Sequence, residues 1–303
     1  MKAVKSILVV TLSNIGDAVM TTPVFERLHE LYPDALIDIV CDPRSQELFR
    51  HCPYRGEMFL KIKQQGKAGL LQLIKRLRKK RYDLIVDLRT DGLAWLLRAR
   101  RRLTKWGHQA YGPHAVEDLI SIIDRINPER RIPPARIWLS DSETQAVGQL
   151  TRDLPGQRWL AIGPGANWPP KIWDADNFAA VANQLAGQID AVIVIGSQQD
   201  ESCIKQTLRQ LQLPALDLAG KTSLLCAAAV LQQCTLFIGN DSGLGHLAST
   251  VGTSTITVFG PGKPERYHPW GENCAWFQGE QQSFSGIMIE AVVAKARELL
   301  AAD

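Results

Sequence analysis

The chain has 303 residues, of which 45% are hydrophobic and 22% charged, and its formal net charge is +4. A chain of this length forms two domains or one large one. Its composition is that of a globular protein and excludes a disordered, collagen-like or coiled-coil chain. The longest apolar runs fall well short of the ~20 residues that a membrane-spanning helix needs, which argues against an integral membrane protein. The early apolar run 7–10 is followed by polar residues and favours a buried first strand over a signal peptide.

Hydrophobic periodicity in the first half of the sequence predicts alternating strands and helices. The strands are expected at residues 6–11, 35–41, 57–60 and 83–88. The helices are expected at residues 16–31, 43–50, 66–80, 93–101 and 116–126. The charged segment 129–139 contains Pro133 and Pro134 and is typical of a connector. A further helix is expected after it, at residues 142–153.

The second half repeats the alternation. Strands are expected at residues 159–162, 191–195, 215–218, 236–238 and 255–259. Helices are expected at residues 175–185, 201–211, 223–233, 244–251 and 287–301. Continuous apolar strands alternating with helices indicate α/β domains with parallel sheets covered on both faces. We therefore predict two Rossmann-like domains with ligands at the carboxyl ends of the strands, facing an interdomain cleft.

The cysteines and histidines give no metal-binding pattern. Six cysteines occur without a Cys-x-x-Cys spacing, and the six histidines are scattered. Buried free thiols in a reducing cytoplasm fit this usage best. We expect no bound metal.

Much of the positive charge lies in one part of the first half. Two clusters carry it, at residues 75–81 and 98–105. Local basic clusters attract phosphates or anionic surfaces, but a solvated helix face gives the same pattern. Both interpretations stay open from the residues alone.

The loop after the first strand contains Asn14, Gly16 and Asp17 and runs into a helix. Gly16 permits a tight strand-to-helix turn. Asp17 is either an acid in the first helical turn, which stabilises a helix, or a carboxylate that acts as a general base.

A second loop follows the first strand of the second half, at residues 163–173. Gly163 and Gly165 would let a ligand approach the backbone, and Lys171 is a cation able to meet phosphate. An exposed lysine is the alternative for Lys171. Trp168 and Trp173 would pack under a base or fill the core, and the core is favoured for Trp173.

The third loop, at residues 237–248, is the most informative. A strand runs into a glycine-rich turn and then into a helix, whose free N–H groups and partial positive charge form an anion site. Ser242 and Gly243 would supply donors to a diphosphate, and His246 lies one turn further on. The alternative is an ordinary N-cap with a packed histidine. The dinucleotide fingerprint is matched only loosely, because three residues separate the strand from Gly243.

These three loops, in this order, resemble glycosyltransferase family 9, the bacterial ADP-heptose:lipopolysaccharide heptosyltransferases. The most specific segments are 236–243, 246–248 and 257–261, and the resemblance covers nearly the whole chain. It implies the GT-B fold. An acceptor-binding domain would span residues 1–150 and a nucleotide-sugar-binding domain residues 151–285. A C-terminal helix, 286–303, would pack back toward the N-terminal domain.

The resemblance also implies roles for individual residues. Asp17 matches the general base, and Lys171 matches a lysine that neutralises the leaving diphosphate. The expected donor-binding residues are Gly163, Gly165, Lys171, Asp241, Ser242, Gly243, Leu244 and His246. The expected acceptor-binding residues are Asn14, Gly16, Arg89, Arg98 and Arg101.

The implied reaction is an inverting, metal-independent transfer of heptose from ADP-heptose to the lipopolysaccharide inner core. The acceptor is anionic and lipid-linked, so the basic clusters would hold it or the membrane surface. We expect a cytoplasmic enzyme, peripheral at the inner membrane, with a nucleotide sugar as co-substrate and no nucleic-acid partner. The alternatives are a transferase using another nucleotide sugar, an epimerase of the same fold and a non-catalytic nucleotide-sugar binder.

Overall fold

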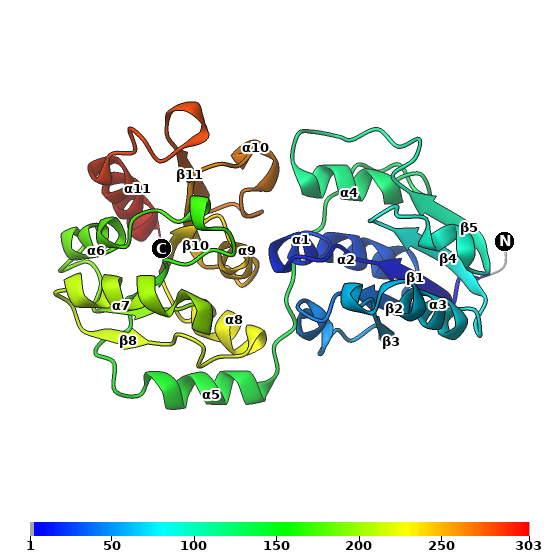
Figure 1. Ribbon diagram of the computed structural model, residues 1–303, viewed down its shortest axis with the longest axis horizontal. Helices are drawn as coiled ribbons and strands as arrows, with labels where there is room; N and C mark the ends of the chain where they lie inside the picture. The colour runs from blue at the N-terminus through cyan, green and yellow to red at the C-terminus, as the bar shows by residue number, and fades with distance from the viewer. Residues whose placement is uncertain (1–2, 303) are drawn as a thin grey trace. The chain divides into compact units, whose positions relative to one another are not determined.

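The computed structural model describes residues 3–302, which form two compact units (Figure 1). The first unit ends at Trp138 and the second begins at Leu139. Helix α5 (Asp141–Thr151) therefore belongs to the second unit, where it packs on α8 (Leu224–Gln232). The predicted boundary at residue 150 was one helix too late. The prediction of two parallel α/β domains is confirmed.

Unit 1 contains a five-stranded parallel sheet in the order β3-β2-β1-β4-β5. Its strands are β1 (Ser6–Val10), β2 (Leu36–Cys41), β3 (Arg55–Leu60), β4 (Tyr82–Asp87) and β5 (Ala99–Thr104). Its helices are α1 (Ile15–Val19), α2 (Thr22–Leu31), α3 (Gly66–Leu77) and α4 (Ala115–Ile123). The central strand β1 is wholly buried from Ile7 to Val10, which explains its continuous apolar sequence.

The sequence prediction of one helix at residues 16–31 was wrong, because the chain forms two helices there. The hydroxyl of Thr21 donates to the carbonyl of Ala18, and the hydroxyl of Thr22 donates to the carbonyl of Val19. Pro23 has no N–H to continue a helical ladder and stands in the first turn of α2. The chain therefore bends between α1 and α2, and α1 stays a single short turn after β1.

The predicted helix at residues 93–101 was also wrong. A 3-10 turn covers Leu93–Leu96, and the arginine-rich run forms the edge strand β5, which pairs in parallel with β4. Arg102 ties the two together, because its guanidinium donates to the carbonyls of Ala94 and Leu97. Arginine runs favour helices in isolation, and here tertiary pairing overrides that preference.

Unit 2 contains a six-stranded parallel sheet in the order β11-β10-β9-β6-β7-β8. Its strands are β6 (Trp159–Gly163), β7 (Ala191–Val194), β8 (Ala215–Asp217), β9 (Leu236–Asn240), β10 (Ser254–Phe259) and β11 (Cys274–Gln278). The remaining helices are α6 (Ala175–Gln184), α7 (Glu201–Gln210), α9 (Gly243–Thr250), α10 (Pro264–Tyr267) and α11 (Ile289–Ala302). Strand β11 was not predicted, although residues 274–277 form a short apolar run; in the structure this edge strand is only partly buried.

The last helix, α11, packs on α6 and contributes Val292, Val293 and Ala296 to the core of unit 2. Its Arg297 donates to the carbonyl of Gln184 at 3.0 Å, at the C-terminal end of α6. The idea that this helix also packs toward the N-terminal domain stays a prediction.

Strand order reverses once in each sheet. In unit 1 the reversal lies between β1 and β4, and in unit 2 it lies between β6 and β9. In open α/β sheets ligands bind beyond the carboxyl ends of the strands at such a point. The loops after these four strands are therefore the places to look for a site.

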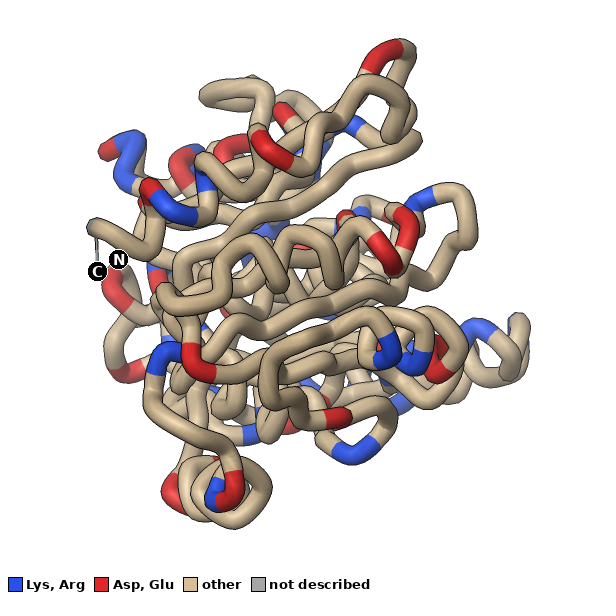
Figure 2. Tube along the Cα trace, turned by 90° about the vertical axis from the view of Figure 1, so that its left-hand side faces the viewer, with Lys and Arg blue, Asp and Glu red and all other residues tan. Residues whose placement is uncertain are grey.

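Apart from the basic clusters at residues 75–81 and 98–105, charged residues of both signs are interspersed along the chain. Figure 2 shows lysine and arginine positions mixed with aspartate and glutamate positions along the trace. Many are paired, as Lys80 is with the buried Asp38 at 2.7 Å and Arg27 with Glu129 at 2.7 Å. Within residues 3–302, no helix is both long enough and apolar enough to cross a bilayer.

Candidate functional site

One candidate site lies in unit 1 after β1, in the loop that leads into α1. Asn14 precedes the helix, and its side-chain amide donates to the Asp17 carboxylate at 2.9 Å. Asp17 is partly exposed, whereas its neighbours Gly16 and Ala18 are buried. The short helix thus fixes the backbone, while the carboxylate stays accessible beyond the carboxyl end of β1.

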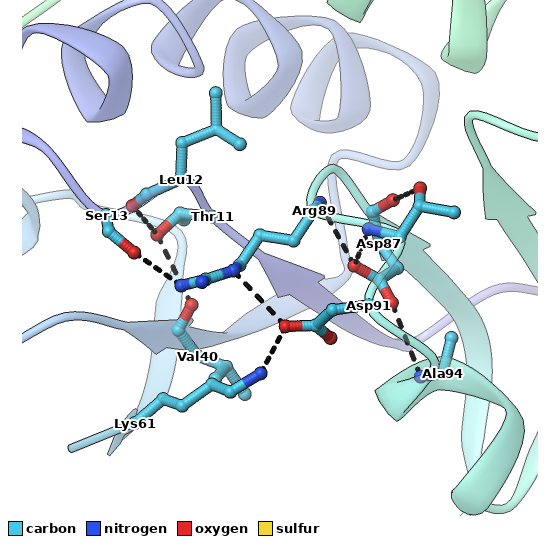
Figure 3. Close-up of polar contacts among 10 residues, drawn as sticks. Thr11, Leu12, Ser13, Val40, Lys61, Asp87, Arg89, Asp91 and Ala94 are labelled. Atoms are coloured by element: carbon cyan, nitrogen blue, oxygen red, sulfur yellow. Dashed lines mark hydrogen bonds and ion pairs between the residues drawn. The ribbon is translucent and has the colours of Figure 1, made fainter. Parts of the chain in front are cut away.

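The loop after β4 reaches across to the same place (Figure 3). The guanidinium of Arg89 donates to the hydroxyl of Ser13 in the β1 loop, and its Nε lies 3.3 Å from the Asp91 carboxylate. The ammonium of Lys61, from the end of β3, contacts the same carboxylate. Two cations from two strands are therefore held together by one acid beside the loop that carries Asp17.

The acid in this cluster is kept charged. Burial alone would raise the pKa of Asp91, but the hydrogen bond and charge of Lys61, with the charge of Arg89, bring that pKa below its ordinary value. Asp91 and Lys61 were not predicted from the sequence. In the sequence they are recognisable only as polar residues that follow two different strands.

A second acid shapes the same loop from within. Asp87 ends β4 and is fully buried. Its carboxylate accepts backbone N–H groups from Arg89 at 3.1 Å and from Thr90 at 2.8 Å. Thr90 has a φ of 57°, a left-handed conformation that the loop requires of a residue other than glycine. Burial raises the pKa of Asp87. Through these hydrogen bonds Asp87 holds the loop backbone that carries Arg89.

The structure does not bring Arg98 and Arg101 to this site. Arg98 precedes β5, and its carbonyl accepts the N–H of Tyr82, the first residue of β4. Arg101 lies within β5 opposite Leu84 and donates to the carbonyl of Arg125 at 2.8 Å. Both stand away from the carboxyl ends of β1 and β4. Of the predicted acceptor-binding residues, Asn14 contacts Asp17, Gly16 precedes it in the chain, and Arg89 contacts Ser13 of the same loop.

A second candidate site lies in unit 2, at the reversal between β6 and β9. Lys171 ends a 3-10 turn, Pro169–Lys171, in the loop after β6. Its ammonium lies 2.5 Å from the carboxylate of Asp241, which follows β9. The loop after β10 approaches too, since a Cβ at Gly262 would stand 3.3 Å from the Asp241 carboxylate. Three loops therefore converge on one ion pair.

Asn240 holds two of these loops together and was assigned no role in the sequence. Its side chain is fully buried at the end of β9. The amide oxygen accepts the N–H of Trp173 at 2.9 Å, and the amide nitrogen donates to the carbonyl of Pro164 at 2.8 Å. Trp173 is itself buried and packs edge-on against Phe178, so its predicted place in the core is confirmed.

Helix α9 begins immediately after this ion pair, at Gly243. Ser242 is its N-cap residue, but the side chain makes no capping bond. The Ser242 hydroxyl oxygen is buried and has no hydrogen-bond partner among residues 3–302. No acid lies in the first turn of α9, so no side chain within that turn offsets the positive end of the helix. Leu244 is partly exposed.

His246, in the first turns of α9, is a further residue predicted to bind the donor. His246 is 5% exposed, within the buried side of α9, as the packing alternative expects. Its contact with a donor stays a prediction.

The two glycines of the β6 loop are constrained by the protein itself. A Cβ at Gly163 would lie 2.9 Å from the ring of Phe237, and one at Gly165 would lie 2.2 Å from the side chain of Asp200. Close packing therefore already requires glycine at both positions. That they also bind the donor stays a prediction.

The two candidate sites offer different chemistry. Unit 1 presents an accessible carboxylate beside two cations, which suits removal of a proton from an anionic substrate. Unit 2 presents a lysine and a helix N-terminus, which suit a phosphate-bearing group. Among the described residues, 3–302, no group of three or more His, Cys, Asp or Glu side chains could hold a metal ion. Independence from metal stays a prediction.

Two parallel α/β units with such loops at their strand reversals are the architecture of a two-domain enzyme that handles phosphate-bearing ligands. A sequence model of glycosyltransferase family 9 (heptosyltransferase) matches residues 70–286. That segment is well over half of the sequence. The chain belongs to glycosyltransferase family 9, and it is a glycosyltransferase.

Individual relatives agree with this assignment. Lipopolysaccharide heptosyltransferase 3 of Escherichia coli is 29% identical over 291 residues, covering 86% of this chain and 85% of the relative. Lipooligosaccharide heptosyltransferase 2 of Haemophilus influenzae is 26% identical, covering 98% and 99%.

Solved structures share the fold across the whole chain. A family 9 glycosyl transferase from Veillonella parvula superposes with a TM-score of 0.89 at 21% identity, covering 99% of this chain and 98% of that one. The E. coli ADP-heptose lipopolysaccharide heptosyltransferase II gives a TM-score of 0.80 at 23% identity, covering 98% and 99%. E. coli heptosyltransferase WaaC with ADP-2-deoxy-2-fluoro heptose gives 0.77 at 18% identity, covering 97% and 99%.

Proposed function

We propose that the protein transfers heptose from ADP-heptose to the inner core of lipopolysaccharide, with inversion at the anomeric carbon. The observation that carries the proposal is the convergence of Lys171 with the N-terminal end of α9. This places a side-chain cation beside backbone donors of the kind that bind diphosphates. The relatives' names supply the sugar and the acceptor, since they include lipopolysaccharide heptosyltransferases.

The donor is held by unit 2. The diphosphate lies against the first turn of α9, with donors from Gly243 and from the buried hydroxyl of Ser242. Asp241 meets sugar hydroxyls and holds Lys171 in place until the diphosphate arrives. As the glycosidic bond to ADP breaks, negative charge grows on the diphosphate, and Lys171 and the helix end stabilise it. Preorganised donors of this kind usually supply the largest part of the rate enhancement.

The acceptor is held by unit 1. Its hydroxyl donates to the Asp17 carboxylate, which removes the proton as the oxygen attacks the anomeric carbon. Asn14 orients that carboxylate through its 2.9 Å hydrogen bond. Arg89 and Lys61 face the anionic groups of the acceptor, with Asp91 limiting their net charge. A positioned carboxylate base contributes about 10²–10⁴-fold to the rate.

The proposed location is the cytoplasmic face of the inner membrane, with peripheral attachment. A lipid-linked, anionic acceptor requires the enzyme to approach a charged surface. The clusters at residues 75–81 and 98–105 would be attracted to it at about 1 kcal/mol for each basic residue near the lipid. This attraction weakens with salt.

One assay tests the proposal directly. The purified enzyme is incubated with ADP-heptose, with and without a deacylated, water-soluble inner-core acceptor, and ADP release is measured. Release that depends on the acceptor, with an inverted anomeric configuration in the product by NMR, is the expected result. An isomerised donor without ADP release would identify an epimerase instead. Donor binding without any turnover would identify a nucleotide-sugar binder.

The donor is tested separately by competition. ADP-heptose, ADP-glucose and UDP-glucose are compared at equal concentration for acceptor-dependent nucleotide release. Preference for ADP-heptose supports the proposal, and faster release from another nucleotide sugar contradicts the assignment of the donor.

A further inference from the structure

Two tryptophans of unit 1 stand exposed beside the edge strand β5. Trp95, in the 3-10 turn before the strand, is 54% exposed, and Trp106, after the strand, is 63% exposed. Their rings stack with centroids 5.9 Å apart and planes inclined by 25°. Leu96, next to Trp95, is 51% exposed. We call these three residues the tryptophan patch.

The exposed side chains of the patch are not part of the hydrophobic core. The other side of the same turn is buried, through Leu93, Ala94 and Leu97. The turn is therefore apolar on both faces, although only one of them packs against the protein. Apolar residues exposed singly are common, but a group of large ones in contact marks an interaction surface.

Polar side chains hold the backbone beneath the patch and leave the rings outside. The guanidinium of Arg102 donates to the carbonyls of Ala94 and Leu97 and lies 5.8 Å from the centre of the Trp95 ring. Arg125 donates to the carbonyl of Trp106 at 3.0 Å. The tryptophans are thus presented on a fixed frame.

The charge around the tryptophan patch indicates which kind of partner binds it. The segment 95–106 has five basic residues and no acidic one. Three of them, Arg98, Arg101 and Arg102, have no acidic partner within residues 3–302. Tryptophan and leucine flanked by arginine and lysine is the combination found where proteins meet the boundary between lipid headgroups and acyl chains.

We propose that the tryptophan patch docks the enzyme on an anionic phospholipid bilayer by inserting its side chains among the headgroups. The inference rests on the proposed function, because an enzyme with a lipid-linked acceptor must approach a membrane. The proposed function assigns membrane attachment to basic charge alone, whereas this inference assigns the anchor to three apolar side chains. The arginines attract the surface, and the patch supplies contact that salt does not screen.

The test measures cosedimentation of the full-length protein with vesicles of phosphatidylcholine, with and without phosphatidylglycerol, at low and high salt. The double variant Trp95→Ser/Trp106→Ser is compared with wild type. The control is Leu36→Ser, because Leu36 is 56% exposed at the start of β2 and belongs neither to the patch nor to the basic clusters. We expect the double variant to lose about tenfold in vesicle affinity at both salt concentrations, since buried apolar area is lost, and the control to bind normally.

A charge variant separates the two contributions. Arg98→Gln/Arg101→Gln should weaken binding at low salt and have little effect at high salt. In wild type, vesicles should also shift tryptophan fluorescence to shorter wavelength, and brominated lipids should quench it. Both signals should fall in the double variant, whose melting temperature should match wild type because the rings are exposed.

Vesicle binding by the double variant equal to wild type would overturn the proposal. So would wild-type binding that high salt abolishes completely. Sedimentation velocity checks the competing occupant: a wild-type dimer that the double variant dissociates, with vesicle binding unchanged, would assign the patch to a second copy of the chain. None of these readouts needs turnover. Failure of ADP-heptose turnover with patch-dependent vesicle binding would therefore count against the proposed function alone.

Discussion

The ammonium of Lys171 and the carboxylate of Asp241 lie 2.5 Å apart, although 70 positions separate them in the sequence. The pair joins the loops after β6 and β9 on the two sides of the strand reversal in unit 2. A phosphate group that enters here therefore meets a lysine already held in place by a partner. The arrangement lowers the cost of ordering a long side chain when the donor binds.

We expect Lys171→Ala to lower kcat by about 10²–10³-fold, because charge on the leaving diphosphate is stabilised mainly as the bond breaks. Asp241→Asn should have a smaller effect on kcat and a larger one on the KM of the donor, since it releases the lysine and removes an acceptor for sugar hydroxyls. Steady-state kinetics of ADP release measure both. Lys205→Ala is the matched control, because Lys205 pairs with Glu201 on the outer face of α7. Equal loss in Lys205→Ala would remove the assigned role.

The accessible carboxylate of unit 1 allows a sharper kinetic test. Asp17→Asn keeps the shape and the contact with Asn14 but cannot accept a proton, so kcat should fall by about 10²–10⁴-fold. Affinity for ADP, measured by calorimetry, should be unchanged, because the proposed nucleotide-binding loops lie in unit 2. Asn14→Ala should show an intermediate loss. The exposed acid Asp34 provides the control variant Asp34→Asn. If Asp17→Asn retained wild-type turnover, another group would have to be the base.

Most of the elements were predictable because buried parallel strands leave a clear signal. Strands such as β1 and β7 are continuous apolar runs bounded by polar loops, and the structure places them where the pattern does. The errors fall where local sequence and tertiary pairing disagree. The arginine-rich β5 is a strand only because β4 offers it an edge, and no periodicity shows that.

The candidate site residues were predictable only in part, because some of them are brought together by tertiary pairing. Asp17, Lys171 and Ser242 lie in loops with recognisable sequence motifs, and these motifs predict them as site residues. The partners that hold the site come from separate strands: Lys61 and Asp91 contact each other in space, while Asn240 joins Pro164 to Trp173. Such contacts depend on strand order, which a single sequence does not specify. Arg98 does not join the cluster around Arg89 because it lies at the amino end of β5, whereas the cluster lies beyond the carboxyl end of β4.

The buried amide of Asn240 leads to a stability prediction. Asn240→Ala would leave the N–H of Trp173 and the carbonyl of Pro164 without their partner, which costs about 1–3 kcal/mol for each buried group left unsatisfied. The expected result is a lower melting temperature together with a raised KM for the donor, since the β6 loop carries Lys171. Asn240→Asp can still accept from Trp173, but it places a buried carboxylate oxygen against the carbonyl of Pro164, so it should lose at least as much stability as alanine at pH 7. Thermal unfolding measures the order, and equal stability of all three proteins would contradict it.

The acid cluster of unit 1 predicts a pH dependence with a definite sign. The pKa of Asp91 in the folded protein lies below its ordinary value, because Lys61 and Arg89 outweigh the effect of burial. A carboxylate with a depressed pKa contributes stability that is present above its unfolded pKa, about 3.9, and is lost as pH falls through the folded pKa. Asp91→Asn should therefore destabilise the protein at pH 7 and make little difference at the lowest pH where the chain stays folded. Urea unfolding across that range measures the difference, with Asp34→Asn as control. A destabilisation by Asp91→Asn that stayed constant with pH would show that the carboxylate acts through its shape and not through its charge.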